Sequence, residues 1–227
     1  MPPKASIWIV IAAYNEAAVV GSVVREVAER CYHVIVVDEG SKDLTGDLAA
    51  NAGAHVLTHP VNLGQGAALQ TGIKFALQQG ASFVVTFDAD GQHRAADIPR
   101  LVDALGKNNA DFALGSRFLG SSSGMPMSRR LLLKAATWFT RLTTGLSVTD
   151  THNGFRAMTR RGASHIALRQ NRMAHASELL DQISASGLRY VEVPVTIEYS
   201  RYSVAKGQRL ADSFAILLDL SVQKLQR

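Results

Sequence analysis

The sequence predicts a doubly wound α/β fold, in which a mostly parallel sheet carries helices on both faces. Two observations favour it: short apolar runs recur through the first half, and segments with helical periodicity separate them. Polar residues directly follow several of these runs, as expected where parallel strands end at a ligand-binding edge. With 227 residues, 47% of them hydrophobic and 19% charged, the chain suits one globular domain.

The elements of the first half follow in order. Residues 7–13 form a continuous apolar run, typical of a strand buried on both faces. Asn15 is a candidate cap for the next helix, in which valines recur at positions 20, 23, 24 and 27. Further strands are predicted at 34–37, 54–58, 83–87 and 112–114, and further helices over about ten residues from Asp43, at 66–79 and at 95–106.

The second half is less regular. Residues 120–125 read GSSSGM, which predicts a flexible loop, and residues 128–144 predict a basic, apolar helix. The sequence shows no repeat, low-complexity tract or domain linker, so we expect a single domain. The remaining predicted elements are helices at 161–169 and 176–186, a strand at 190–197 and an amphipathic C-terminal helix from Gln208.

Charge and cysteine content restrict the function classes only loosely. Lys and Arg number 24 against 19 Asp and Glu, a net charge of +5, which suits nucleic acid, anionic phosphates or an anionic membrane surface. The single cysteine, Cys31, excludes an internal disulfide framework and fits a reducing cytosol. The first apolar run is short for a signal peptide, and no stretch approaches the roughly 18 residues of a membrane span. We therefore expect a cytoplasmic chain whose membrane contact, if any, is peripheral.

The motif after the 83–87 strand carries the clearest chemistry. Asp88 and Asp90 flank Ala89, and carboxylates one residue apart can share a hard divalent cation, Mg²⁺ or Mn²⁺, with places left for phosphate oxygens. Gln92 offers a third oxygen. The alternative for an isolated motif of this kind is a capped strand-to-helix turn.

Two other strand ends and one glycine loop offer polar groups. Asp38 follows the second strand, where an acid can accept hydrogen bonds from a nucleobase or ribose, although an ordinary turn is the alternative there. Tyr14 and its neighbours follow the first strand, so three carboxyl-end loops should face one crevice. The NLGQG loop before the 66–79 helix is no dinucleotide fingerprint, because Leu69 stands where a glycine is required.

The ordered set AAYNE, VVDEGSKDLT, NLGQGAAL, FDADGQH, GSRF and DTHNGFRAM resembles glycosyltransferase family 2 over about residues 5–200. Within that family it is most similar to the dolichyl- and polyprenyl-phosphate sugar synthases. The resemblance implies a GT-A fold, with a Rossmann-like central sheet, a nucleotide-sugar donor, a divalent metal and inversion at the anomeric carbon. It also implies a donor half at 1–118, an acceptor half at 119–207 and a C-terminal helix at 208–227.

The resemblance also assigns roles to residues. Asp90 and Arg117 join the catalytic set, with Arg117 meeting phosphate oxygens. Arg129 or Arg130 would meet the acceptor's lipid phosphate, with a solvated helix face as an equal alternative. The metal would be bound by Asp88, Asp90 and Gln92. Arg201 and Lys206 would reach the donor from a closing loop. The other donor-binding residues would be Ala13, Tyr14, Glu16, Asp38, Glu39, Gln65, Asp88 and Ala89.

The acceptor decides whether a base is needed. A polyprenyl phosphate is already an anion at pH 7, whereas a sugar hydroxyl would need Asp150 or Glu178 to remove its proton. Asp150 and Arg156 belong to a segment that resembles the family's D-x-x-x-GFR, which usually lies near the acceptor. His175, before Glu178, is either structural or functional.

Two departures from the family pattern bear on the donor. Glu39 stands where the family usually has a second Asp, so the negative charge is kept on a longer side chain. The late basic segment, often R-x-x-G-x-S-K in the family, here runs from Arg201 to Gln208 with Lys206 as its second cation.

The expected partners are a nucleotide sugar and a polyprenyl phosphate. The helix at 128–144 mixes cations with large apolar residues, which suits an anionic interface or packing on its own domain. The C-terminal helix suits the same interface, a membrane-protein partner or a second subunit. Nucleic acid is not expected, because no basic and aromatic array of the RNA-binding type occurs. Two rival interpretations remain. A nucleotidyltransferase is disfavoured because the basic glycine-rich loop typical of that class is missing. A non-catalytic binding module is disfavoured because the metal-binding acids are intact.

Overall fold

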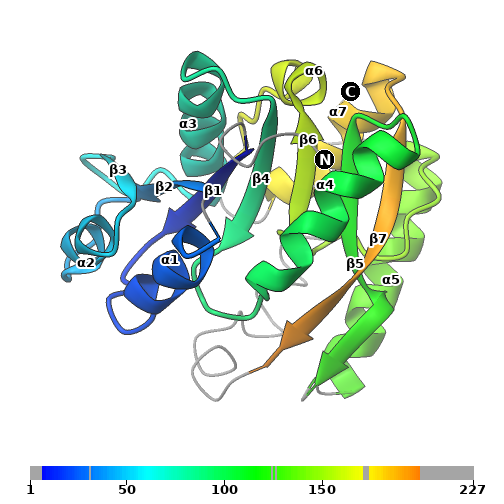
Figure 1. Cartoon of the computed structure of the whole chain (residues 1–227). Coiled ribbons are helices and arrows are strands. Elements are labelled where there is room, and N and C mark those ends of the chain that lie inside the picture. The colour runs from blue at the N-terminus through cyan, green and yellow to red at the C-terminus, as the bar shows by residue number, and fades with distance from the viewer. Residues whose placement is uncertain (1–6, 31, 124, 126, 171–173, 200–227) are drawn as a thin grey trace.

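A seven-stranded sheet forms the centre of the computed structural model, with helices on both sides of it (Figure 1). The structure describes residues 7–30, 32–123, 125, 127–170 and 174–199. The strand order is β3-β2-β1-β4-β6-β5-β7, and neighbours pair in parallel except for β6, which is antiparallel to β4 and β5. The predicted mixed α/β class is confirmed.

The elements have the following bounds. The strands are β1 (Ile7–Ala13), β2 (His33–Asp38), β3 (His55–Thr58), β4 (Phe83–Asp88), β5 (Phe112–Ser123), β6 (Arg156–Thr159) and β7 (Tyr190–Glu198). The helices are α1 (Val20–Ala28), α2 (Thr45–Asn51), α3 (Gln65–Gln78), α4 (Ile98–Lys107), α5 (Met127–Thr144), α6 (Arg160–His165) and α7 (Ala174–Ser186), with a 3₁₀ turn at Ala95–Asp97 before α4.

The sheet separates two apolar layers. Ile9 of β1 belongs to the layer that packs against α1, α2 and α4, and Val10 belongs to the layer under α3, α6 and α7. Side chains on a strand alternate between faces, so an entirely apolar β1 supplies both layers. Gly72 lets α3 approach closely, because a Cβ there would lie 2.3 Å from Cγ1 of Val10.

The chain reverses its direction of winding at β1, and this positions the crevice. From β1 it proceeds through β2 and β3 to one side and then returns to β4 on the other. Ala12 is paired with Asp88 at the carboxyl ends of β1 and β4. Ligands of open α/β sheets bind at such a switch point, so the fold brings the polar loops of both strands to one place.

Several sequence-based expectations need correction. Asn15 does not cap α1: it has φ 52°, its side chain accepts from the backbone N–H of Lys42, and α1 begins at Val20 without a side-chain cap. Strand β5 continues to Ser123 through most of the predicted GSSSGM loop, since it pairs with β7 along that length. Strand β6 was not predicted. Helix α6 ends at His165 rather than at 169.

Some predicted features lie outside the residues that the structure describes. Arg201, Lys206 and the C-terminal helix from Gln208 lie beyond residue 199, outside the part of the chain that the structure describes. Within the described residues, each helix is too short or too polar to cross a bilayer.

Candidate active site

The loops after β1 and β2 are tied together by their own side chains. The backbone N–H of Asn15 donates to Ser41 Oγ over 2.9 Å, and the backbone N–H of Lys42 donates to Asn15 Oδ1 over 2.8 Å. The backbone N–H of Glu16 donates to Thr45 Oγ1 over 2.8 Å. These bonds explain the polar residues of the AAYNE and DEGSKDLT motifs, because each loop satisfies backbone groups of the other.

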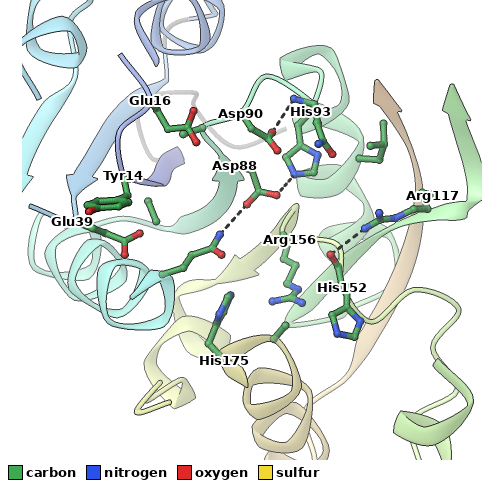
Figure 2. Close-up of a pocket in the computed structure, with 17 residues that line it drawn as sticks. Tyr14, Glu16, Glu39, Asp88, Asp90, His93, Arg117, His152, Arg156 and His175 are labelled. Carbon is green, nitrogen blue, oxygen red and sulfur yellow. Dashed lines mark hydrogen bonds and ion pairs between the residues drawn. The ribbon is translucent and has the colours of Figure 1, made fainter. Parts of the chain in front are cut away.

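A pocket of about 300 Å³ opens where these loops meet the ends of β4, β5 and β6 (Figure 2). That volume is at the lower end of the usual range for small-molecule sites. It is lined by Ala12, Tyr14, Glu16, Glu39, Gln65, Asp88, Ala89, Asp90, Gln92, His93, Arg117, His152, Gly154, Arg156, His175, Ala176 and Ile197.

Asp88 and Asp90 lie at the centre of the pocket and are both half-buried. Asp88 accepts from Gln65 Nε2 over 3.2 Å and pairs with His93 Nε2 over 2.8 Å. Burial would raise the pKa of Asp88, but the charge and hydrogen bond of His93, together with the charges of His175 and Arg156, lower it. Burial and the charge of Asp88 raise the pKa of Asp90 to about 6.

This carboxylate pair fits a divalent cation. Burial and repulsion from Asp88 both raise the pKa of Asp90, and a cation bound by the two acids would offset both effects. Carboxylate oxygens are the donors that Mg²⁺ and Mn²⁺ prefer, and Mg²⁺ usually keeps substrate phosphates among its ligands. Within the described part of the chain, His, Cys, Asp and Glu side chains do not gather in threes suited to a metal. The pair therefore fits a cation that shares its coordination with a bound ligand.

Gly154 allows β6 to approach the acids. A Cβ at this position would lie 2.4 Å from Oδ1 of Asp88, far inside contact distance. The Thr86 hydroxyl donates to the Gly154 carbonyl over 2.6 Å and so fixes the segment next to β4. A glycine here is required by space rather than by backbone angle.

Arg117 lies at the far wall and is held by several partners. Its Nε donates to Asp150 Oδ2 over 2.7 Å, its Nη1 to the Tyr199 hydroxyl over 2.8 Å and its Nη2 to the His152 carbonyl over 3.0 Å. Burial would lower the pKa of Arg117, but Asp150 and Tyr199 outweigh it and raise the pKa. The Asp150 side chain is fully buried behind the pocket and orients Arg117.

Two further basic side chains complete this wall. Arg156 begins β6, and burial lowers its pKa to about 10, so its guanidinium stays charged near neutral pH. Burial lowers the pKa of His152 to about 4, which leaves its imidazole neutral.

Tyr14 and Glu39 form the opposite end of the pocket (Figure 2). Burial and the neighbouring Asp38 raise the pKa of Glu39 to about 7. Asp38 itself does not line the pocket; its carboxylate accepts from the backbone N–H of Ser41 over 3.0 Å.

The structure brings together most of the residues singled out from the sequence, but not all. Glu178 is the clearest exception: its carboxylate accepts from the backbone N–H groups of Arg169 and Gln170, at 3.0 and 2.8 Å, and it does not line the pocket. Ala13 and Asp150 are buried behind the lining, and Arg130 is exposed on α5. Nine predicted site residues line the pocket: Tyr14, Glu16, Glu39, Gln65, Asp88, Ala89, Asp90, Gln92 and Arg117.

Four polar or charged residues that line the pocket were not among the predicted site residues, although the resemblance placed Arg156 in a segment near the acceptor and left His175 open. His93 and Arg156 stand inside motifs that had been noticed, but their inward position depends on contacts that only the fold creates. The others are His152 and His175, for which no spacing rule points to the crevice.

Comparison with known proteins agrees with the motifs. A family model described as glycosyl transferase family 2 matches residues 8–166. The UDP-N-acetylglucosamine–dolichyl-phosphate N-acetylglucosaminyltransferase of Methanococcus voltae is 30% identical, over 96% of this chain and 96% of its own. The polyprenol monophosphomannose synthase of Mycolicibacterium smegmatis is 32% identical, over 90% of this chain and 82% of its own.

Solved structures share the fold. Glucosyl-3-phosphoglycerate synthase from Mycobacterium tuberculosis, crystallised with Mn²⁺ and UDP-glucose, superposes with a TM-score of 0.75 at 22% identity. The match covers 98% of this chain and 78% of the synthase, so the likeness extends over the whole sheet and its helices.

Proposed function

Because the chain belongs to glycosyl transferase family 2, we propose that it moves a hexose from a UDP- or GDP-linked sugar to a polyprenyl phosphate, with Mg²⁺ or Mn²⁺. The dolichyl- and polyprenyl-phosphate acceptors named for its relatives support this acceptor class. The single observation that carries the proposal is the Asp88–Asp90 pair, which lies in one pocket with the cations of Arg117 and Arg156. That pocket combines acids for a metal with guanidinium groups for phosphates.

The donor would lie along the carboxyl ends of β1, β2 and β4. Tyr14 and Glu39 would contact the nucleoside, and Asp88 and Asp90 would hold the cation beside the diphosphate, with the Gln92 side chain also at the pocket wall. When bound, the cation would neutralise charge on the departing nucleoside diphosphate. Gln65 and His93 fix the Asp88 carboxylate, so its position is set before ligands arrive.

The geometry favours a phosphate acceptor over a sugar hydroxyl. A phosphate oxygen would attack the anomeric carbon, the bond to the diphosphate oxygen would break, and its electron pair would leave with the diphosphate. This displacement needs no proton acceptor. The two acids considered as bases are engaged elsewhere, Asp150 by Arg117 and Glu178 by backbone N–H groups.

Helix α5 offers a surface for the membrane in which such an acceptor resides. The α5 apolar stripe, defined as Met127, Leu131, Trp138 and Leu142, is 63 to 68% exposed in each case. At about 100° per residue these positions fall within about 60° of arc, and the exposed cations of α5 flank them on one side. Amphipathic helices with cations and Trp bind anionic lipid in this way, which supports a peripheral membrane location. The cytoplasmic face is part of the proposal. The flanking cations are Arg130, Lys134 and Arg141.

The proposal is tested by incubating the chain with UDP-glucose, UDP-N-acetylglucosamine or GDP-mannose and Mn²⁺, with and without undecaprenyl or dolichyl phosphate. We expect a sugar–phospholipid product with one donor, dependent on metal. Asp90→Asn should abolish it, whereas Arg25→Gln, on the exposed side of α1, should not. Transfer to a sugar hydroxyl without lipid phosphate, or no lipid product with any donor, would overturn the acceptor assignment.

A further inference from the structure

The imidazole of His93 donates a hydrogen bond to Asp88 from a buried position. Its Nε2 lies 2.8 Å from Asp88 Oδ2, along the dashed line in Figure 2, and only 3% of the side chain is exposed. An ionised carboxylate can only accept, so the hydrogen of this bond belongs to Nε2. The other ring nitrogen, Nδ1, is buried and lacks a hydrogen-bond partner within the described residues.

The orientation of this ring therefore depends on more than hydrogen bonds. In a neutral histidine, the bond made by one ring nitrogen commonly decides which nitrogen carries the hydrogen. His93 has that support on its Asp88 side alone, and rotation of the ring about its Cβ–Cγ bond would break the bond to the carboxylate. Packing has to prevent this rotation.

Two phenyl rings flank the imidazole and close a triangle with it. The ring centroids of Phe155 and Phe87 lie 5.0 and 5.3 Å from that of His93, and 5.1 Å from each other. These are contact distances for aromatic pairs. Phe87 is 1% exposed and Phe155 is 0% exposed, so the rings belong to the close-packed interior, where a neighbouring side chain has little room to turn.

Phe155 is the member of the triangle that comes from a distant part of the chain. Phe87 directly precedes Asp88 at the end of β4, whereas Phe155 directly precedes β6. The backbone of Phe155 is fixed on both sides: its N–H donates to Asn153 Oδ1 over 3.0 Å, and its carbonyl accepts from the Gly115 N–H over 2.9 Å. The phenyl ring is thus a fixed wall for the imidazole.

We propose that Phe155 is a positioning residue, which holds the His93 ring and thereby fixes the Asp88 carboxylate in the orientation that the cation requires. The inference rests on the proposed function, in which Asp88 and Asp90 hold Mg²⁺ or Mn²⁺. Gln65 also donates to Asp88, but over 3.2 Å and from a half-buried side chain, so the shorter bond from His93 constrains the carboxylate more strongly.

Phe155→Leu tests the proposal, with Phe112→Leu as the matched control. Phe112 is an equally buried phenylalanine, but it belongs to the apolar layer under α3, α6 and α7 and does not line the pocket. Urea unfolding should show a similar loss of stability in both variants. Phe155→Met is the second test variant, because its flexible side chain fills more of the space without restoring a ring.

The first measurement is the state of the His93 ring in the metal-free protein, by two-bond ¹H–¹⁵N correlation at pH 8. His93→Gln identifies the signal. We expect a single tautomer with its hydrogen on Nε2 in wild type and in Phe112→Leu. In Phe155→Leu and Phe155→Met, the two ring nitrogens should shift toward each other, because the ring turns and both tautomers are populated.

The second measurement is Mn²⁺ affinity, from the paramagnetic resonance of the free ion, with Mn²⁺ alone and with UDP or GDP. Loss of a partner that orients a metal ligand costs about 10- to 100-fold in metal affinity; we expect this range for His93→Gln and about tenfold for Phe155→Leu, which keeps the imidazole. In sugar transfer, Phe155→Leu should raise the Mn²⁺ concentration needed for half-maximal rate, and saturating Mn²⁺ should restore most of kcat. Added to His93→Gln, Phe155→Leu should cost less than about twofold further, since the ring through which it acts is gone.

Three results would overturn the inference. They are a single Nε2–H tautomer with wild-type Mn²⁺ affinity in the Phe155 variants, an equal loss of Mn²⁺ affinity in Phe112→Leu, or an effect of Phe155→Leu that is as large in His93→Gln as in wild type. Failure of the proposed function gives a different result. If wild type neither binds Mn²⁺ nor transfers sugar, the metal role of Asp88 is wrong, whereas the tautomer measurement still decides whether Phe155 holds His93.

Discussion

The absence of a side chain at Gly154 sets the position of Asp88. In Gly154→Ala, the new Cβ would lie 2.4 Å from Asp88 Oδ1, so the carboxylate must move. Because displacement of a reacting group by about 1 Å can cost about 100-fold, we expect kcat/KM to fall by roughly that factor. Sugar transfer and the unfolding midpoint should be measured together.

Gly106→Ala is the matched control for this variant. Gly106 lies within α4, and a Cβ there meets nothing within 4 Å. We expect this variant to keep full activity and to gain about 0.5–1 kcal/mol of stability, as alanine is the better helix former. If Gly154→Ala were as active as Gly106→Ala, the position of Asp88 would not depend on the missing side chain at Gly154.

The raised pKa of Glu39 makes the stability of the fold depend on pH. Its pKa is about 7 in the folded chain against an ordinary value of 4.5, so the folded state binds more protons than the unfolded state between these values. Unfolding free energy should fall as pH rises from about 4.5 to 7. Glu39→Gln should remove that loss and be more stable by about 1–2 kcal/mol at pH 8, since water at the pocket reduces the full effect.

Urea unfolding of wild type and Glu39→Gln at pH 5 and pH 8 measures this difference. The advantage of the variant should shrink toward pH 5, where the wild-type carboxyl is protonated in the fold. An advantage that is constant across pH, or that grows at pH 5, would show that Glu39 is not the titrating group.

Among the elements, the loops after β1 and β2 are hydrogen-bonded to each other, and together they hold the backbone of Glu16 in place. Thr45 is fully buried, accepts from the backbone N–H of Glu16 and bonds to Asp43. Thr45→Val keeps the shape and removes the hydroxyl, leaving the Glu16 N–H without that partner. We expect a loss of about 1–3 kcal/mol, the cost of an unsatisfied buried donor.

Thr45→Ser is the control, because it keeps the hydroxyl. Urea unfolding should place it nearer to wild type than Thr45→Val. A Thr45→Val variant as stable as wild type would mean that water or another group satisfies the Glu16 N–H.

The elements also show where sequence patterns succeed. Strand β4 and its acids were predictable, because a strand buried on both faces reads as an apolar run that ends at Asp88. Strand β6 was not, since its four residues include Arg156 and Thr159 and show no strand pattern. The far part of β5 was missed because GSSSG is typical of a loop, and only pairing with β7 makes it a strand.

In the candidate site, too, some residues could be predicted from the sequence and others could not. The lining residues that follow predicted strands, such as Asp88 and Glu39, were identified from the sequence. Glu178 was a candidate base in the sequence, but the sequence does not show that its carboxylate accepts from the backbone N–H of Arg169, outside the pocket lining. The inward position of Arg156 depends on its pairing between β4 and β5, which no linear pattern reveals.

At the scale of the whole molecule, the α5 apolar stripe should determine where the chain resides. We expect the wild-type chain to float with vesicles that contain anionic phospholipid and to be released by high salt, since screening weakens the contribution of Lys134 and its neighbours. Replacing Trp138 and Leu142 together by Ser should reduce binding at least tenfold, because both side chains lie exposed on α5.

Leu44→Ser is the control for this pair, because Leu44 is 62% exposed but lies at the start of α2. It should bind vesicles as wild type does. Equal binding by the double variant, or no flotation of wild type, would remove α5 from the membrane contact.

The position of the antiparallel strand β6 between β4 and β5 affects the order in which the strands can pair during synthesis. Synthesis proceeds from β1, so β4 and β5 leave the ribosome before β6, the strand that separates them. Until about forty further residues emerge, β4 has one open edge and β5 has two, and such edges invite pairing with other chains. The nascent chain is thus most prone to aggregation late in translation, and the strand that joins β4 to β5 is also the one that brings Arg156 to the pocket wall.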